Sequence, residues 1–224
     1  LGLAVLTIGL LSVSFAQDLT VDQIVEKANH AAYYQGQDGR AQVHMTITDS
    51  QDRTREREFT ILRLDVDQKE EGGNRVDGEQ KFYVYFHKPA DVNKQVFMVW
   101  KHIKKDDDRW LYLPSLNLVK RIAASDERTS FAVSNFFYEY VSGRGIHEDS
   151  HELLETTDTY YVLKSVPKEP DLVEFSEYKN YIHKDTFIPI QTEYFDKNGE
   201  KYRVYKVLEV KDIQDFKTVV KSQM

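Results

Sequence analysis

Residues 82–86 read Phe-Tyr-Val-Tyr-Phe, and this short run decides the fold more than any other part of the sequence. Its phenylalanines and valine alternate with its tyrosines, which is the period of two of a β-strand. A sheet packed on one side has one apolar and one polar face, but here both faces are apolar. The runs 96–100 and 110–113 repeat this two-sided pattern. It fits a β-sandwich core, tyrosines exposed on an outer face, or a curved sheet whose concave face holds a helix and an apolar ligand.

Outward from this run, the chain continues as strands. Alternating or continuous apolar residues predict further strands at 43–47, 53–66, 109–113, 117–122, 159–166, 173–183, 186–195 and 201–211. The apolar parity changes between Ile61 and Leu62, which predicts a bulge or twist there. Residues 196–199, Asp-Lys-Asn-Gly, are typical of a hairpin turn. Because no helix alternates with these strands, we expect a mainly antiparallel β fold with a few helices (α+β).

Two segments depart from the strand pattern. Thr20 to Gln23 fit a capping box, and the apolar spacing that follows predicts an amphipathic helix over 20–34. Residues 123–142 interrupt the strand rhythm and are predicted to form a lid of short helices and turns. With no repeat or linker visible, residues 17–224 are expected to form a single domain.

The composition excludes several classes of function. A chain of 224 residues with 30% charged and 12% aromatic side chains fits one folded domain. The net charge of −7 provides no basic surface for nucleic acid. The absence of cysteine excludes disulfides, thiol catalysis, iron–sulfur clusters and cysteine-based zinc sites.

The first 16 residues, LGLAVLTIGLLSVSFA, form an uncharged apolar run. The run is shorter than the about 20 residues of a membrane-spanning helix, and it ends in the small residues Ser14 and Ala16. We expect residues 1–16 to be the apolar part and cleavage site of a signal peptide whose basic beginning is missing; an uncleaved anchor is the alternative. Gln17 stands where an exported lipoprotein has a lipidated cysteine, so a soluble periplasmic protein is expected.

One motif suggests a metal site. Residues 147–151 read His-Glu-Asp-Ser-His, which matches the H-E-x-x-H pattern of zinc hydrolases. That chemistry needs His147 and His151 on one helix face, whereas Gly143, Gly145 and the strand-like sequence that follows indicate a charged loop. A zinc hydrolase is therefore kept as a minor alternative. We expect no catalytic residues, no metal and no cofactor.

A resemblance to a known family is carried by residues 110–144. The run WLYLPSLNLVKRI (110–122) is followed by AASDERTSF (123–131) and by SNFFYEYVSGR (134–144). This block resembles the outer-membrane lipoprotein-sorting proteins of Gram-negative bacteria, the LolA-like family, whose signature runs W-[LI]-Y-L-P, R-I, S-F and Y-E-D. The chain departs from it at Val133, Asn135 and Tyr140, where the family usually has Gly, Asp and Asp.

The resemblance implies a fold and a function. The implied fold is an incomplete, half-open antiparallel β-barrel wrapped around helices, with an apolar cavity that shelters acyl chains in the periplasm. Relatives often accompany inner-membrane transporters of the resistance-nodulation-division (RND) class, which implies a possible partner. Family members also tend to continue beyond residue 224, so the chain is expected to be truncated at the C-terminus, leaving an edge strand unpaired.

From these observations we expect a non-catalytic periplasmic carrier of lipids, lipoprotein acyl chains or similar hydrophobic cargo, with only transient membrane contact and no nucleic-acid partner. A non-catalytic adaptor subunit of an envelope transport complex is the alternative. The lid is expected at 131–141. The candidate cavity and lid residues, for each of which plain core packing is the competing interpretation, are Met45, Phe82, Val84, Phe86, Met98, Trp100, Trp110, Tyr112, Phe131, Phe136, Phe137 and Tyr138. Arg121 and Arg128 are candidates for gripping a head group or anchoring the lid, and a structural ion pair is the competing role.

Overall fold

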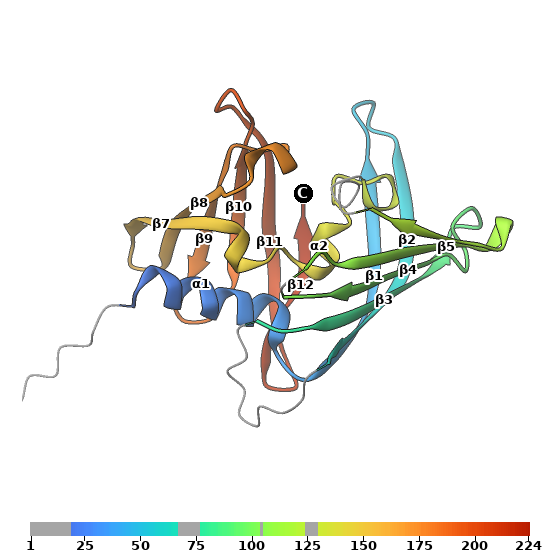
Figure 1. Ribbon diagram of the computed structural model, residues 1–224, viewed down its shortest axis with the longest axis horizontal. Helices are drawn as coiled ribbons and strands as arrows, with labels where there is room; N and C mark the ends of the chain where they lie inside the picture. The colour runs from blue at the N-terminus through green and yellow to red at the C-terminus, as the bar shows by residue number, and fades with distance from the viewer. Residues whose placement is uncertain (1–18, 67–76, 104, 124–129) are drawn as a thin grey trace, which may run out of the picture.

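The strands form two six-stranded antiparallel sheets (Figure 1). The computed structural model describes residues 19–66, 77–103, 105–123 and 130–224, so the predicted signal peptide lies outside the described residues. The first sheet contains β1 (Asp38–Thr48), β2 (Thr54–Asp65), β3 (Gln80–Lys88), β4 (Val96–Lys101), β5 (Asp108–Leu113) and β6 (Leu118–Ile122). The second contains β7 (Asp149–Thr156), β8 (Tyr160–Pro167), β9 (Glu177–His183), β10 (Pro189–Phe195), β11 (Lys201–Ile213) and β12 (Phe216–Gln223).

Each sheet is a simple meander. Strands that follow one another in the chain are also neighbours in the sheet, in the orders β1 to β6 and β12 to β7. This confirms the predicted mainly antiparallel β class. The predicted hairpin at 196–199 is also confirmed, since Gly199 has a φ of 81° and its amide donates to Asp196 O.

The helix at the start of the described chain packs on the second sheet. Helix α1 (Val21–Asn29) has the predicted capping box, in which Gln23 N donates to Thr20 Oγ1 at 3.2 Å and Thr20 N to Gln23 Oε1 at 3.0 Å. Ile24 and Ala28 pack against Leu163 and Ile182. None of the helices in the described ranges has the length and apolarity needed to cross a membrane.

The predicted helix over 20–34 does not stay α-helical to its end. After Asn29 the chain makes one π-helical turn, His30–Tyr34. Tyr34 is buried and its hydroxyl donates to Gly78 O at 3.0 Å, while the ammonium of Lys101 lies over the ring of Tyr33 at 5.6 Å. The tyrosines that end the helix thus contact the first sheet, whereas α1 contacts the second.

Residues 130–142, the described part of the segment predicted as a lid, contain short turns as expected, whereas 124–129 lie outside the described residues. Short 3₁₀ turns lie at Pro114–Leu116, Phe131–Val133, Ile146–Glu148 and Pro170–Leu172, and α2 is Glu139–Ser142. The strand predicted over 173–183 begins only at Glu177, after the turn at Pro170–Leu172.

The prediction of a bulge between Ile61 and Leu62 was wrong. The register of β2 against β3 shifts between Glu58 and Phe59 instead, and Ile61 and Leu62 follow without interruption. The apolar parity changes there because both faces of β2 are apolar, with Phe59 buried on one side and Leu62 41% exposed on the other.

A segment that joins the two sheets lies between them (Figure 1). Lys101 Nζ of β4 donates to Ser142 O of α2 at 3.1 Å. On the other side, the Arg144 guanidinium binds the Asp149 carboxylate with Nε at 2.9 Å and Nη2 at 2.9 Å. Tyr178 of β9 donates to the same carboxylate at 2.6 Å. Residues 139–149 are therefore bonded to both sheets.

Gly143 lies in this closely packed segment, directly against the ring of Tyr33. Its φ is 74°, and a Cβ built on it would lie 2.5–2.8 Å from ring atoms of Tyr33. We expect Gly143→Ala to lower the free energy of unfolding by about 3 kcal/mol, from left-handed strain plus overpacking. Gly199→Ala is the matched control, because φ is 81° there but the added Cβ meets open space, and about 1 kcal/mol is expected. Urea denaturation measures both, and equal losses would contradict the close approach to Tyr33.

Candidate functional site

The strand register distributes the predicted cavity residues over two faces of the first sheet. Phe82 of β3 pairs with Val99 of β4, whereas Tyr83 pairs with Met98. Paired residues share a face and neighbours along a strand alternate. The inner face, which residues 130–138 cover, therefore carries Phe82, Val84, Phe86 and Met45. The outer face carries Met98, Trp100, Trp110 and Tyr112, so the two sets do not line one cavity.

The inner face is covered by residues 130–138, which we call the plug. Phe131 is 3% exposed, and its ring centroid lies 5.8 Å from Phe59, 5.7 Å from Phe86 and 5.9 Å from Phe97. Tyr138 lies 4.6 Å from Phe97 by the same measure. Phe136 and Met45 pack at the border of this cluster. An apolar surface and an apolar cover thus meet face to face.

The plug satisfies its own hydrogen bonds. Phe131 N donates to Phe136 O at 2.7 Å, Ser134 N donates to Phe131 O at 3.0 Å, and Ser130 Oγ donates to Ser134 O at 2.7 Å. Within the described residues, every hydrogen bond of 130–138 has its partner inside 130–141. Apolar side-chain contacts therefore hold the plug on the sheet.

The plug contains backbone strain. Ala132 has a φ of 53° and Val133 a φ of 61°, in the left-handed region. A β-branched residue is a rare outlier there, because its Cβ crowds the following carbonyl. Val133 is 65% exposed, so no buried contact compensates for the strain.

Phe137 faces the second sheet rather than the first. The Arg203 guanidinium lies 3.9 Å from its ring centroid, and Tyr140 stacks on it at 5.7 Å. Burial raises the pKa of Tyr140 to about 12, and burial also raises the pKa values of Tyr178 and Tyr194 well above their usual range. The region between the sheets thus contains a dry cluster of neutral phenols.

A buried arginine lies on the inner face, two residues from Phe59. Arg57 pairs with Met45 across the strands and is 6% exposed. Its nearest carboxylate is that of Asp91, with an Nη2–Oδ2 distance of 3.7 Å, and its Nε has no hydrogen-bond partner among the described residues. Such a guanidinium can accept an anionic group.

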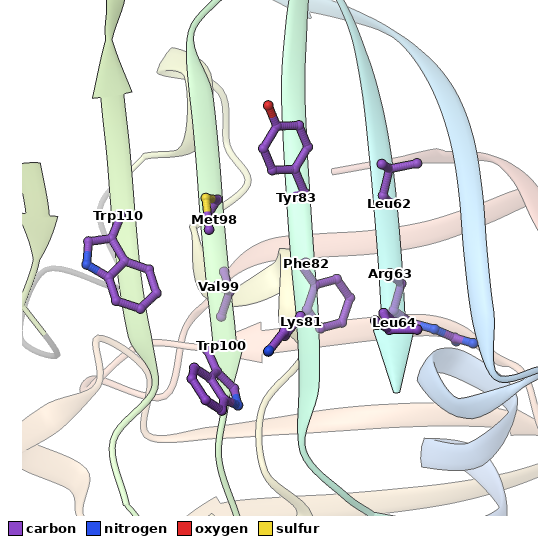
Figure 2. Close-up of a pocket in the computed structure, with 10 residues that line it drawn as sticks. All are labelled: Leu62, Arg63, Leu64, Lys81, Phe82, Tyr83, Met98, Val99, Trp100 and Trp110. Atoms are coloured by element: carbon purple, nitrogen blue, oxygen red, sulfur yellow. The ribbon is translucent and has the colours of Figure 1, made fainter. Parts of the chain in front are cut away.

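A groove of about 390 Å³ lies on the outer face (Figure 2). Figure 2 shows Trp110, Met98, Tyr83 and Leu62 side by side across β5, β4, β3 and β2. Lys81 also lines the groove, with its ammonium 4.3 Å from the ring centroid of Trp100.

Of the two candidate arginines, the structure describes only Arg121, which does not reach the inner face. Arg121 pairs with Trp110 on the outer face, where its exposed guanidinium forms an ion pair with Asp108. This is the structural role that competed with head-group binding in the sequence analysis. Arg128 lies outside the described residues.

The arrangement of 147–151 does not suit zinc. His147 lies in a 3₁₀ turn and His151 in β7, so the two imidazoles do not share a helix face. His151 Nε2 contacts Ile146 O at 3.0 Å and Nδ1 contacts Ser165 Oγ at 2.8 Å. Since a carbonyl only accepts, Nε2 carries the proton and the Nδ1 lone pair is engaged by the serine hydroxyl. Among the described residues there is also no cluster of three or more potential metal ligands.

Several residues on both faces were not predicted from the sequence. Phe59, Phe97 and Val99 lie at the centre of the inner face, and Leu62, Leu64 and Tyr83 line the outer groove. The alternation within 96–100 separates Phe97 and Val99 from Met98 and Trp100. The sequence therefore indicated that these residues lie on two different faces of the sheet. It did not show which set would be covered.

Comparisons with known proteins agree on the fold. A family model described as "Uncharacterized protein" matches residues 78–224. No curated protein matches the chain. A DUF1329 family protein from Desulfovibrio piger is similar in structure, with a TM-score of 0.75 at 25% identity, over 89% of this chain and 83% of the other.

Two further solved structures share this architecture. A domain from Vibrio parahaemolyticus, provisionally named an outer membrane lipoprotein-sorting protein domain, has a TM-score of 0.77 at 22% identity, over 91% of this chain and 85% of the other. A LolA superfamily protein from Nitrosomonas europaea has a TM-score of 0.61 at 17% identity, over 88% and 80%. The chain therefore has the LolA-like fold that residues 110–144 predicted.

The buried phenols predict loss of stability at alkaline pH. Because burial raises the pKa of Tyr140 from 10.0 to about 12, its contribution is complete below about pH 10 and disappears as the pH rises towards 12. That single group accounts for about 3 kcal/mol. We expect urea denaturation at increasing pH to show this decline, with a shallower slope for Tyr140→Phe. An unchanged slope in the variant would contradict the assignment.

Proposed function

The chain belongs to the family whose model matches residues 78–224, and we propose that it is a carrier of hydrophobic cargo. In this proposal an acyl chain binds between the inner face of the first sheet and the plug. The LolA-like fold supports it, as do solved structures of the same fold named for lipoprotein sorting.

The observation that carries the proposal is the self-contained hydrogen bonding of the plug. If residues 130–138 move away from the sheet, no described hydrogen bond between them and the sheet is broken. Only apolar contacts are lost, and an acyl chain replaces those contacts with contacts of the same kind. An apolar cover that can leave without exposing unpaired polar groups is therefore exchangeable for apolar cargo.

The energies are consistent with reversible exchange. Burial of an acyl chain contributes about 0.8 kcal/mol per methylene. Removing Phe131 from Phe59, Phe86 and Phe97 costs a few kcal/mol, comparable to the burial of several methylenes. Left-handed strain at Ala132 and Val133 further weakens the closed position of the plug.

Arg57 supports cargo with an anionic head. Its buried guanidinium donates from Nη1 to Glu56 O at 3.0 Å, but its Nε is unpaired and its only carboxylate partner among the described residues, Asp91, is 3.7 Å away. A carboxylate or phosphate on the cargo would complete its hydrogen bonding. The proposed ligand is thus an acyl chain with a nearby negative charge.

The place of action is also part of the proposal. The apolar run at 1–16 supports export to the periplasm, with residues 17–224 as one binding domain. A lipid or an acylated lipoprotein is the proposed cargo. No RND-type transporter is included, because none of the matched proteins named above is described as a partner of one.

Phe131→Ala separates a displaceable plug from an ordinary core residue. It should lower the stability of the cargo-free protein by about 3–5 kcal/mol, because a buried ring is removed. It should nevertheless raise the affinity for a fluorescent long-chain fatty acid about tenfold, since cargo no longer has to displace the ring. If stability and affinity fall together, the ring belongs to the core and the proposal fails. Phe97→Leu, in the wall of the inner face, should lower both quantities.

Val133→Gly should raise stability and lower the affinity for the fatty acid, the opposite of the effects expected for Phe131→Ala. Glycine relieves the left-handed strain at an exposed position, so we expect the closed protein to become more stable by roughly 0.5–1 kcal/mol. A more stable plug should weaken fatty-acid binding about twofold to fivefold. Titration of the labelled fatty acid and urea denaturation measure the two effects, and stronger binding would be inconsistent with a plug.

Arg57→Gln tests the head-group contact. Affinity for the fatty acid should fall about tenfold, because one charge-assisted contact is lost. Affinity for a fatty alcohol of the same chain length should stay the same and serves as the control. Equal losses for both ligands would remove Arg57 from the binding site.

A further inference from the structure

The outer face of the first sheet carries a second apolar surface. One register row runs across all six strands, through Arg40, Leu62, Tyr83, Met98, Trp110 and Arg121. At a strand spacing of about 4.8 Å, this row is roughly 24 Å long. Leu62, Tyr83 and Met98 are 41%, 38% and 42% exposed, so solvent reaches large apolar side chains along it.

The face continues beyond this row in both directions along the strands. Leu64 and Trp100 line the same groove. Val119, which pairs with Tyr112, is 62% exposed. A contiguous apolar surface of this breadth is unusual on a protein that remains free in water and indicates a binding partner.

Two polar groups on this face are hydrogen-bond donors without a partner in the described part of the chain. Within the described residues, Tyr83 Oη and Trp110 Nε1 have no hydrogen-bond partner, and Figure 2 shows both side chains among those that line the groove. Tyrosine and tryptophan with an apolar body and a free donor are enriched where lipid tails meet head groups.

The free charges are positive. Neither Arg40 nor Lys81 has an ion-pair partner among the described residues. The nearby acids are engaged, since Asp108 binds His102 and Arg121, and Glu79 binds His102 and Trp100. Of the other carboxylates on this face, Asp38 lies at the β1 end, opposite Leu64. Glu56 and Glu58 lie towards the far end of β2, where they contact His44 and Lys88. The groove itself is lined by no carboxylate, although the whole chain has a net charge of −7.

We propose that the outer face of the first sheet docks on the surface of an anionic lipid bilayer. Leu62, Met98 and Trp110 enter the boundary between head groups and acyl chains, and Arg40 and Lys81 contact lipid phosphates. A wide, shallow face suits a bilayer better than a single amphiphile, which would remain half exposed in it. The site lies on the opposite side of the sheet from the proposed cargo site and does not depend on it.

The chain provides its own probe for this contact. Its two tryptophans, Trp100 and Trp110, both line the outer groove, so intrinsic fluorescence reports on this face. Cargo-free protein would be mixed with vesicles of phosphatidylcholine alone, or of phosphatidylcholine and phosphatidylglycerol in equal parts. We expect a blue shift with the mixed vesicles, quenching by bromine-labelled acyl chains, and much weaker binding to phosphatidylcholine alone.

Two variants with matched controls locate the contact. Leu62→Glu should lower the partition coefficient about tenfold or more, whereas Leu154→Glu, on an exposed position of the second sheet, should not change it. Lys81→Gln should lower it about fivefold, and Lys221→Gln on β12 should not.

Several results would overturn the proposal. These are no binding to mixed vesicles, equal losses in a variant and its control, a blue shift only with monomeric dodecyl phosphate, or a stable dimer that Leu62→Glu separates. None of these four results decides the carrier proposal, because fatty-acid binding is measured without vesicles and should be unchanged in Leu62→Glu. A chain that binds vesicles but no fatty acid would refute the carrier and leave the docking face in place.

Discussion

The connection between the two sheets depends on one buried cation, Arg144, whose charge must be paired. The Arg144 guanidinium binds Asp149, whose side chain is 1% exposed, and also contacts Glu139 and Glu148. Breaking such a buried pair leaves an uncompensated charge at a cost of several kcal/mol. The joining segment is therefore held beside β7. With Lys101 donating to Ser142, it connects two sheets that share no strand pairing in the part of the chain that the structure describes.

This anchor explains why the plug can be both well placed and weakly held. Residues 139–149 are bonded by charge and hydrogen bonds, whereas 130–138, directly before them, contact the sheet through apolar side chains. A fixed base and an apolar, strained end are what a repeatedly opening cover requires. The same arrangement also separates roles within neighbouring aromatics, since Phe131 faces the first sheet and Phe137 the second.

The two-sided sheet places two surfaces back to back. One face of β2–β5 is covered by the plug and is the proposed place for an acyl chain, and the other is open and is the proposed membrane contact. Cargo and membrane would then be separated by the thickness of a single sheet. A carrier of this design need not expose its cargo site to approach a bilayer, because different side chains of the same strands serve each purpose.

Local patterns determined much of the fold. The period of two predicted the antiparallel strands, Thr20 and Gln23 predicted the start of α1, and residues 196–199 predicted a hairpin, because each depends on neighbours in the chain. The block at 110–144 pointed to the LolA-like fold through its residue pattern.

Tertiary structure alone decided which face of the sheet is covered. Met98, Trp100, Trp110 and Tyr112 are as apolar as Phe82, Val84 and Phe86, so composition could not separate them. Register across strands and the contact with residues 131–141, far along the chain, placed one set under the plug and the other in the open. The role of Arg57 was hidden for the same reason, because burial of a charge is a property of its surroundings and not of its sequence.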